Sequence, residues 1–287
     1  MPGYKFNQTQ TLIFSKSPII MLTAQSFFDL AAYDHPELIR ADAVVWSGLQ
    51  NLKTYLDEQA YPVFSPDLIQ DGIPLKRTFV YYNGTLLESR EFDIEYGDAT
   101  KGGLKVYNDG QPLIGSSVIM AGAVFCTTRI HLGKGVLVEP GALIKGPTII
   151  GDQTEVRQGA YIRGYCLIGK NCVVGHVTEV KHSIFLDGAK AGHFAYLGDS
   201  ILGNDVNLGA GTKLANLRFI KGDIPLKTPT GIVDSNLRKM GAIMGDQVQT
   251  GCNTVTNPGT LLGKRSMVMA NCTVMSGYHE DNSLIKR

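Results

Sequence analysis

Apolar residues recur at every sixth position through the middle of the chain. A period of six fits neither an α-helix nor an alternating β-strand. It is typical of a hexapeptide parallel β-helix, in which three hexads, or roughly 18 residues, complete one triangular coil. The pattern therefore predicts a mainly β protein built on a parallel β-helix. The unbroken series is Ile114, Met120, Cys126, Leu132, Val138, Ile144, Ile150, Val156, Ile162, Ile168, Val174, Val180 and Leu186.

The period shifts after Leu186 and is later interrupted by a loop. Residues 217–241 lack the period and carry prolines and several charges. A long loop leaving a regular solenoid is often functional, so we expect this segment to project from the β-helix. The second series is Leu202, Leu208, Leu214, Met244, Thr250, Thr256, Leu262, Val268 and Val274.

The chain divides into two predicted parts. Residues 1–112 lack the period and are expected to form a small α+β domain of unknown role, followed by the β-helix domain at 113–287. Because an open rod leaves backbone groups unpaired at its ends, the first domain is expected to cover one end.

Local patterns predict two helices and a β-hairpin within the first domain. Residues 26–33 and 44–58 are expected to be helices, the second because its apolar residues follow helical spacing. Strand-like runs at 78–82 and 85–87 flank Asn83-Gly84, a dipeptide that favours a β-hairpin.

Composition excludes several classes of protein. A net charge of +1 argues against nucleic acid or an anionic membrane as partner. No apolar run approaches the ~18 residues that suggest a spanning helix. Five cysteines without a C-x-x-C pair indicate reduced thiols in a cytoplasmic protein. Cys126 falls in the apolar series and is expected to be buried.

Arg163 and Lys181 are the first candidate binding residues. They lie 18 residues apart, so in a coil of 18 they stack on one face. Two stacked cations are unfavourable unless an anion such as a sugar phosphate lies between them. The alternative is a pair of solvated surface cations, and spacing alone leaves both open.

His193 is the candidate base, although a lone histidine is more often structural. It lies in a glycine-flanked segment at the shift of register, and an imidazole can act as a general base. Asn207 and Asn216 follow nearby. His176 and His182, six residues apart, are expected on adjacent faces and would need a third histidine for zinc, so no metal site is expected.

Segments between 163 and 212 resemble the acetyltransferase domain of the bifunctional N-acetylglucosamine-1-phosphate uridylyltransferase/glucosamine-1-phosphate acetyltransferase family. They read V-G-H-V-T-E-V-K-H-S, K-A-G-H-F-A-Y-L-G-D and N-D-V-N-L-G-A-G-T. The segments L-A-N-L-R and G-A-I-M-G-D-Q-V-Q-T-G are closer to archaeal-type sugar-phosphate nucleotidylyltransferases. The resemblance covers about residues 112–287 and implies a left-handed parallel β-helix that assembles as a homotrimer.

The resemblance also implies an activity and its site residues. Acetyl would pass from acetyl-CoA to the amine of an amino-sugar 1-phosphate, glucosamine 1-phosphate first, without a metal. His193 matches the catalytic base, and Asn216 matches the asparagine that orients the thioester. The sugar-phosphate positions are matched by Arg163, Lys181, Tyr196 and Asn207, and the acetyl-CoA positions by Ala210, Cys252, Ala270 and Arg287. Cys252 replaces a serine of the bacterial family.

Two departures from the family bear on function. The first 112 residues are about half the usual length of the nucleotidyltransferase domain and lack its G-x-G-T-R-like loop, so uridylyl transfer is not expected. The 217–241 loop is longer than in the bacterial enzymes, and Arg238 or Lys239 is expected to replace the phosphate-binding lysine. A non-catalytic β-helix scaffold or regulatory subunit, and an acyltransferase with another acyl group or acceptor, remain alternatives.

Overall fold

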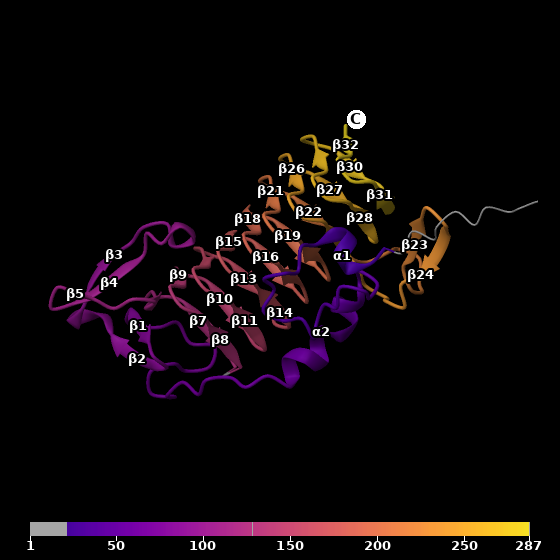
Figure 1. Cartoon of the computed structure of the whole chain (residues 1–287). Coiled ribbons are helices and arrows are strands. Elements are labelled where there is room, and N and C mark those ends of the chain that lie inside the picture. Colours follow the sequence, from indigo (N-terminus) through magenta and orange to yellow (C-terminus); the bar gives the residue numbers. More distant parts are fainter. Residues whose placement is uncertain (1–21, 128, 287) are drawn as a thin grey trace, which may run out of the picture.

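The computed structural model describes residues 22–127 and 129–286, and a parallel β-helix occupies most of them (Figure 1). Three parallel sheets run along this rod, one per face. The fold class is the expected one, a left-handed parallel β-helix of hexapeptide repeats. The rod strands of the first sheet are β6 (Ser117–Ile119), β9 (Leu137–Val138), β12 (Glu155–Val156), β15 (Val173–His176), β18 (Lys190–His193), β21 (Asn207–Leu208), β26 (Gln249–Thr250), β29 (Met267–Val268) and β32 (Leu284–Ile285).

The other two sheets follow the first around each coil. The second sheet contains β7 (Val124–Cys126), β10 (Leu143–Lys145), β13 (Tyr161–Ile162), β16 (Glu179–Lys181), β19 (Tyr196–Gly198), β22 (Lys213–Leu214), β27 (Val255–Thr256) and β30 (Thr273–Val274). The third sheet contains β8 (Ile130–Leu132), β11 (Thr148–Ile150), β14 (Cys166–Ile168), β17 (Ile184–Phe185), β20 (Ile201–Leu202), β25 (Ala242–Met244), β28 (Thr260–Leu262) and β31 (Gly277–His279).

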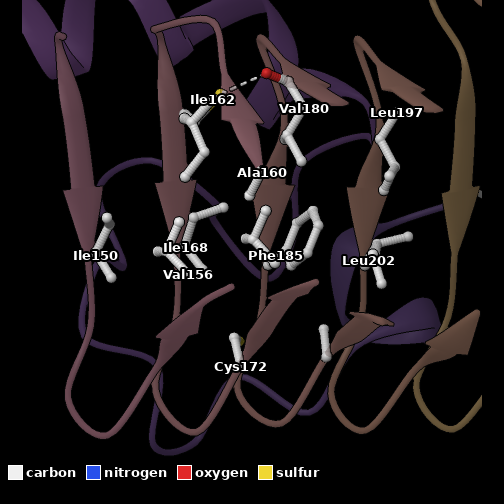
Figure 2. Close-up of a cluster of buried hydrophobic side chains, with 14 of the residues drawn as sticks. Ile150, Val156, Ala160, Ile162, Ile168, Cys172, Val180, Phe185, Leu197 and Leu202 are labelled. Atoms are coloured by element: carbon white, nitrogen blue, oxygen red, sulfur yellow. Dashed lines mark hydrogen bonds between the residues drawn. The ribbon is translucent and has the colours of Figure 1, made fainter. Parts of the chain in front are cut away.

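The predicted apolar series fills the interior of the rod from Leu132 to Val180. Figure 2 shows Ile150, Val156 and Ile162 pointing inward, and all three are fully buried. Each such side chain lies against its equivalent in the next coil, as Ile162 does against Val180. Burial of one large aliphatic side chain contributes ~1.5–3 kcal/mol, so this column is the main source of stability.

The start of the predicted series is wrong by one position. Ile114 is 82% exposed, and the interior positions belong to Ile119 and Phe125, which pair with strands of the next coil. Seven residues rather than six separate Phe125 from Leu132, and a shift of one residue along a strand moves a side chain to the opposite face. Met120 and Cys126 therefore lie outside the rod interior, and Cys126 is only half-buried.

The end of the first series is also corrected. Phe185, not Leu186, pairs with Ile168 and enters the interior, so this coil has 17 residues. Leu186 is buried instead beneath the N-terminal segment. The second series, from Leu202 to Val274, occupies the interior as predicted.

The outer face of the third sheet is covered by residues 22–56 (Figure 1). This segment contains α1 (Ala24–Phe27) and α2 (Ser47–Asp57). The second helix confirms the prediction for 44–58, whereas the first is only four residues long rather than spanning 26–33. The apolar stripe beneath the helices is Ile149, Leu167, Ile184, Ile201, Ile243 and Leu261.

The predicted hairpin extends the first sheet beyond the end of the rod. Strand β1 (Phe79–Tyr82) pairs antiparallel with β2 (Thr85–Glu88) and with β6, which satisfies an open edge. Phe64 packs against Phe125 and closes the interior at this end. Next along the chain come η1 (Ser89–Glu91), η2 (Ala99–Lys101) and a small sheet of β3 (Asp93–Glu95), β4 (Lys105–Asn108) and β5 (Gln111–Pro112).

The 217–241 loop forms a second hairpin that projects from the rod, as expected (Figure 1). Its strands are β23 (Pro225–Thr228) and β24 (Gly231–Asp234). Leu226 is buried against the cluster on the third sheet and holds the hairpin in place. Across 22–127 and 129–286, no helix has the length and apolar character needed to cross a bilayer.

Candidate functional site

His193 lies at the end of β18, at the corner where the chain passes from the first sheet to the second. It is exposed, and its carbonyl oxygen accepts a hydrogen bond from the Gly211 amide at 3.1 Å. Within the described part of the chain, neither nitrogen of its imidazole has a hydrogen-bond partner. The ring is therefore free to accept a proton from a bound molecule.

The predicted acetyl-CoA residues lie in one column with His193. Ala210, Cys252 and Ala270 take the equivalent corner position in successive coils toward the C-terminal end. Backbone hydrogen bonds link these corners. For example, the backbone N–H of Asn253 donates to the Ala210 carbonyl oxygen at 2.8 Å. The column makes a continuous edge of small side chains along which an extended molecule could lie.

His176 occupies the same corner one coil toward the N-terminal end. Its ring stacks on that of His193, with 5.8 Å between ring centroids and an interplanar angle of 25°. The two residues are 17 apart, and the expected coil of 18 concealed this relationship. The prediction that His176 and His182 lie on adjacent faces holds, because His182 bonds to Asp199 at the opposite corner.

Val177 and Phe194 follow the two histidines in a strained backbone conformation. Their φ angles are +50° and +36°, in the left-handed region that β-branched and bulky residues rarely adopt. Both side chains are more than half exposed, at 63% and 55%. Neighbouring coils place Gly211 and Asn253 at this turn position. Strain of this kind is often stored at functional sites, which makes this corner a candidate site.

Arg163 and Lys181 lie where the strands of the second sheet end, across the sheet from the His193 corner. They are in adjacent coils, as predicted. Each cation has its own carboxylate partner: Arg163 lies 2.7 Å from Glu179, and Lys181 lies 3.0 Å from Asp199. The hydrogen bond from Arg163 to Glu179 raises the pKa of the guanidinium further. These pairs reduce the repulsion between the stacked cations within the chain itself.

Asp199 is the centre of this second cluster. Its buried carboxylate accepts hydrogen bonds from Lys181, from the Asn216 amide and from His182, the last at 2.9 Å. Burial alone would raise its pKa, but the hydrogen bonds from His182, Asn216 and Lys181 outweigh burial and lower it. Asp199 ends the segment K-A-G-H-F-A-Y-L-G-D, but the sequence predicted no role for it. Its contact with His182 depends on a coil of 17 residues, whereas the sequence predicted coils of 18.

Tyr196 connects the second cluster to the outer face of the second sheet. Its hydroxyl donates to the Asn216 side-chain oxygen at 3.3 Å. Burial, together with the nearby carboxylates of Glu179 and Asp199, raises the pKa of the Tyr196 hydroxyl, so it stays a donor. The structure thus joins four predicted residues, Arg163, Lys181, Tyr196 and Asn216, at one end of one sheet.

The long loop leaves and re-enters the rod beside this cluster. The Met240 amide donates to the Asn216 carbonyl oxygen at 3.0 Å, and the Gly241 amide donates to that of Asp199 at 2.8 Å. Arg238 and Lys239 are exposed residues directly before this closure. Their side chains thus emerge at the neck of the loop, close to Asn216.

Two predicted residues are not brought to these clusters. Asn207 is exposed on the outer face of the first sheet, between Lys190 and Gln249 in neighbouring coils. Arg287 lies outside the described residues. Among residues 22–127 and 129–286, no group of three or more histidine, cysteine or acidic side chains could hold a metal ion.

The fold places the chain in the class of hexapeptide-repeat β-helix proteins. Its two polar clusters, around His193 and around Asp199, lie on opposite sides of the second sheet. Residues 144–262 match the family model of the GMPPB C-terminal domain. The C-terminal part of the chain is also homologous to bifunctional sugar-1-phosphate nucleotidylyltransferase/acetyltransferases and GlmU proteins, archaeal ones included.

Three relatives illustrate this similarity. The bifunctional sugar-1-phosphate nucleotidylyltransferase/acetyltransferase of Sulfurisphaera tokodaii is 35% identical over 50% of this chain and 41% of its own length. The bifunctional protein GlmU of Methanococcus aeolicus is 34% identical over 71% of this chain and 56% of its own. GlmU of Nostoc sp. is 30% identical over 61% and 36%. The matches thus span between about a third and just over half of these relatives.

Proposed function

We propose that this chain is an N-acetyltransferase that moves acetyl from acetyl-CoA to the amine of an amino-sugar 1-phosphate, with glucosamine 1-phosphate as the first acceptor to test. The observation that carries the proposal is the arrangement on the second sheet. The imidazole of His193, which has no hydrogen-bond partner among the described residues, lies at the corner where the chain enters this sheet, and two cations, Arg163 and Lys181, lie where the strands of the sheet end. The acetyltransferases named among the relatives support the same chemistry.

The reaction assigns a role to each cluster. The acceptor nitrogen attacks the thioester carbonyl, the C–N bond forms, and the C–S bond breaks. His193 takes the proton that the nitrogen loses, and the coenzyme A sulfur leaves as a thiol after protonation. General-base catalysis of this kind contributes ~10²–10⁴ in rate. Ala210, Cys252 and Ala270 offer the edge along which acetyl-CoA extends. Asn216 lies in the Asp199 cluster on the opposite side of the second sheet, so in a homotrimer a second copy of the chain would supply the asparagine that orients the thioester.

The sugar phosphate lies over the second sheet in this proposal. Arg163 and Lys181 bind the phosphate, Tyr196 contacts the sugar, and Arg238 or Lys239 adds a cation from the neck of the loop. Arg163 and Glu179 are both more than a third exposed, so their ion pair is weak, and a phosphate, which also accepts charge-assisted hydrogen bonds, can compete with Glu179 for Arg163. Asn207 lies on the first sheet, so a second copy of the chain, as in a homotrimer, would supply it to this site.

The test is acetyl-CoA-dependent release of free thiol in the presence of glucosamine 1-phosphate. We expect turnover by the full chain and a loss of about 10²–10⁴ in kcat for His193→Ala. His131→Ala, on the third sheet, is the matched control and keeps its activity. If the protein binds acetyl-CoA but acetylates no amino sugar, the proposed acceptor is wrong. The alternative of an acyltransferase with another acceptor is then favoured. If the chain does not bind acetyl-CoA, the alternative of a non-catalytic β-helix scaffold is favoured. We do not expect uridylyl transfer in any of these assays.

A further inference from the structure

A groove of about 430 Å3 lies on the outer face of the first sheet. Residues 96–98, which follow β3, form one wall, and the sheet around Glu139 and Arg157 forms the other. The wall at 96–98 lies outside residues 144–262, which match the family model. The volume falls within the range of small-molecule sites.

The groove is continuous with the proposed site. His176 lines its end, and the same imidazole stacks on His193. A molecule whose reacting amine lies at His193 could therefore continue past His176 onto the first sheet. Acetyl-CoA would extend in the opposite direction, along Ala210 and Cys252, so the two ligands would not compete for space.

The lining of the groove is that of a site for hydroxyl groups. Tyr96 is 52% exposed, and its ring offers a flat apolar surface with a polar edge. One carboxylate oxygen of Glu139 accepts from the backbone N–H of Gln158 at 2.8 Å, and among the described residues the other oxygen has no hydrogen-bond partner. Arg157 is paired with Glu155 at 2.7 Å and retains further N–H donors.

The charge of the lining disfavours a phosphate. Asp98, Glu139 and Glu155 line the groove with one guanidinium, that of Arg157. Glu155 is paired with Arg157, and Asp98 is paired with Lys101 at 2.8 Å, so Glu139 adds a negative charge that no ion pair among the described residues offsets. The two cations suited to phosphate, Arg163 and Lys181, lie on the second sheet instead. The ligand of the groove is therefore neutral and rich in hydroxyl groups, as a sugar ring is.

We propose that this groove binds a second sugar ring, so that the acceptor is larger than a single amino-sugar phosphate. The ring would pack its C–H face on Tyr96 and donate hydroxyl hydrogen bonds to Glu139. This assignment rests on the proposed function for its link to catalysis, but the groove can be tested without turnover.

The first experiment measures binding of N,N′-diacetylchitobiose, a neutral disaccharide, by saturation-transfer NMR and titration calorimetry on the full chain. We expect saturable binding that is weakened about tenfold, or 1.4 kcal/mol, by Tyr96→Ala and also weakened by Glu139→Gln. Tyr107→Ala, on β4 of the small sheet that Tyr96 follows, lines a different cavity, so this variant is the matched control and leaves binding unchanged. Equal binding by Tyr96→Ala and the unaltered chain, or no binding, would overturn the proposal.

A second measurement separates the two proposals. The kcat/KM for a glucosamine disaccharide is compared with that for glucosamine 1-phosphate in the unaltered chain and in Tyr96→Ala. Selective loss with the disaccharide supports the groove. Acetylation of glucosamine 1-phosphate without disaccharide binding overturns the groove alone. Tyr96-dependent binding without acetylation of either acceptor overturns the proposed function and leaves the groove standing.

Discussion

The imidazole of His176 lies nearly parallel to that of His193, one coil below it, with 5.8 Å between the ring centroids. The flat contact restricts the orientation of the His193 ring, which has no hydrogen bond within the described residues to do so. His176 is thus placed to position the proposed base without touching the reacting atoms.

We expect His176→Ala to lower kcat by less than His193→Ala does, by about tenfold, because the base remains but its ring is less restrained. His176→Phe keeps a stacking ring and should recover part of the loss. Steady-state thiol release with each variant makes the comparison. A His176→Ala variant with unaltered kcat would show that the stack does not position the base.

Asp199 predicts a specific dependence of stability on pH. Its folded-state pKa is lowered, so its contribution to stability is fully present above the unfolded value of about 3.9 and is lost as pH falls through the folded value. At neutral pH, Asp199→Asn should reduce the free energy of unfolding by about 3 kcal/mol, since Lys181 loses its partner.

Urea unfolding of both proteins from about pH 7 to about pH 3 measures this dependence. The difference between the unaltered chain and Asp199→Asn should shrink at the acidic end. A difference that stays constant over the whole range would contradict the assigned pKa direction. Asp234→Asn, on the exposed strand of the projecting hairpin, is the matched control.

Two threonines in the rod interior should respond oppositely to the same substitution. Among the described residues, the buried Thr256 hydroxyl has no hydrogen-bond partner, whereas the Thr250 hydroxyl bonds to Thr212 at 3.0 Å and accepts from the backbone N–H of Gly209. Thr256→Val removes an unsatisfied polar group and should stabilise the protein by about 1 kcal/mol. Thr250→Val should destabilise it by a similar amount. Calorimetric melting of both variants checks the sign, and a lower Tm for Thr256→Val would refute this account.

The strained turn at Val177 predicts a trade between stability and activity. Val177→Asn places a residue that tolerates the left-handed region at φ +50° and should raise the free energy of unfolding by about 1 kcal/mol. If the exposed Val177 side chain serves the site, the same variant loses acetyl transfer. Asn253→Val, at the equivalent turn with φ +55°, is the reverse control and should destabilise. Unchanged stability in both variants would show that the turns carry no strain.

The six-residue period was sufficient to predict the rod, because only inward positions must be apolar and their spacing is set by the coil. It could not place the ends of the series. One extra residue before Leu132 and one missing residue before Phe185 lie in corners, where side chains face solvent and leave no periodic signal. The same missing residue hid the stacking of His176 on His193.

The candidate site was predictable only in part. Arg163, Lys181, Tyr196 and Asn216 do gather at one end of the second sheet, while their carboxylate partners, Glu179 and Asp199, were not foreseen. Opposite charges 16 or 18 residues apart are common in a charged repeat, so only the corner geometry identifies these pairs. The groove at Tyr96 could not be predicted at all, since it joins two segments with no shared pattern.

The segment that carries α1 and α2 gives the rod a preferred orientation in any assembly. A three-sided β-helix without this segment could contact another copy through any of its faces. The apolar stripe from Ile149 to Leu261 would then make the third sheet the face most prone to association. With that stripe covered from within the chain, the second sheet and the part of the first sheet beyond residues 96–113 remain open. They meet at the edge that carries His193, so lateral contact between copies is directed toward the proposed catalytic corner.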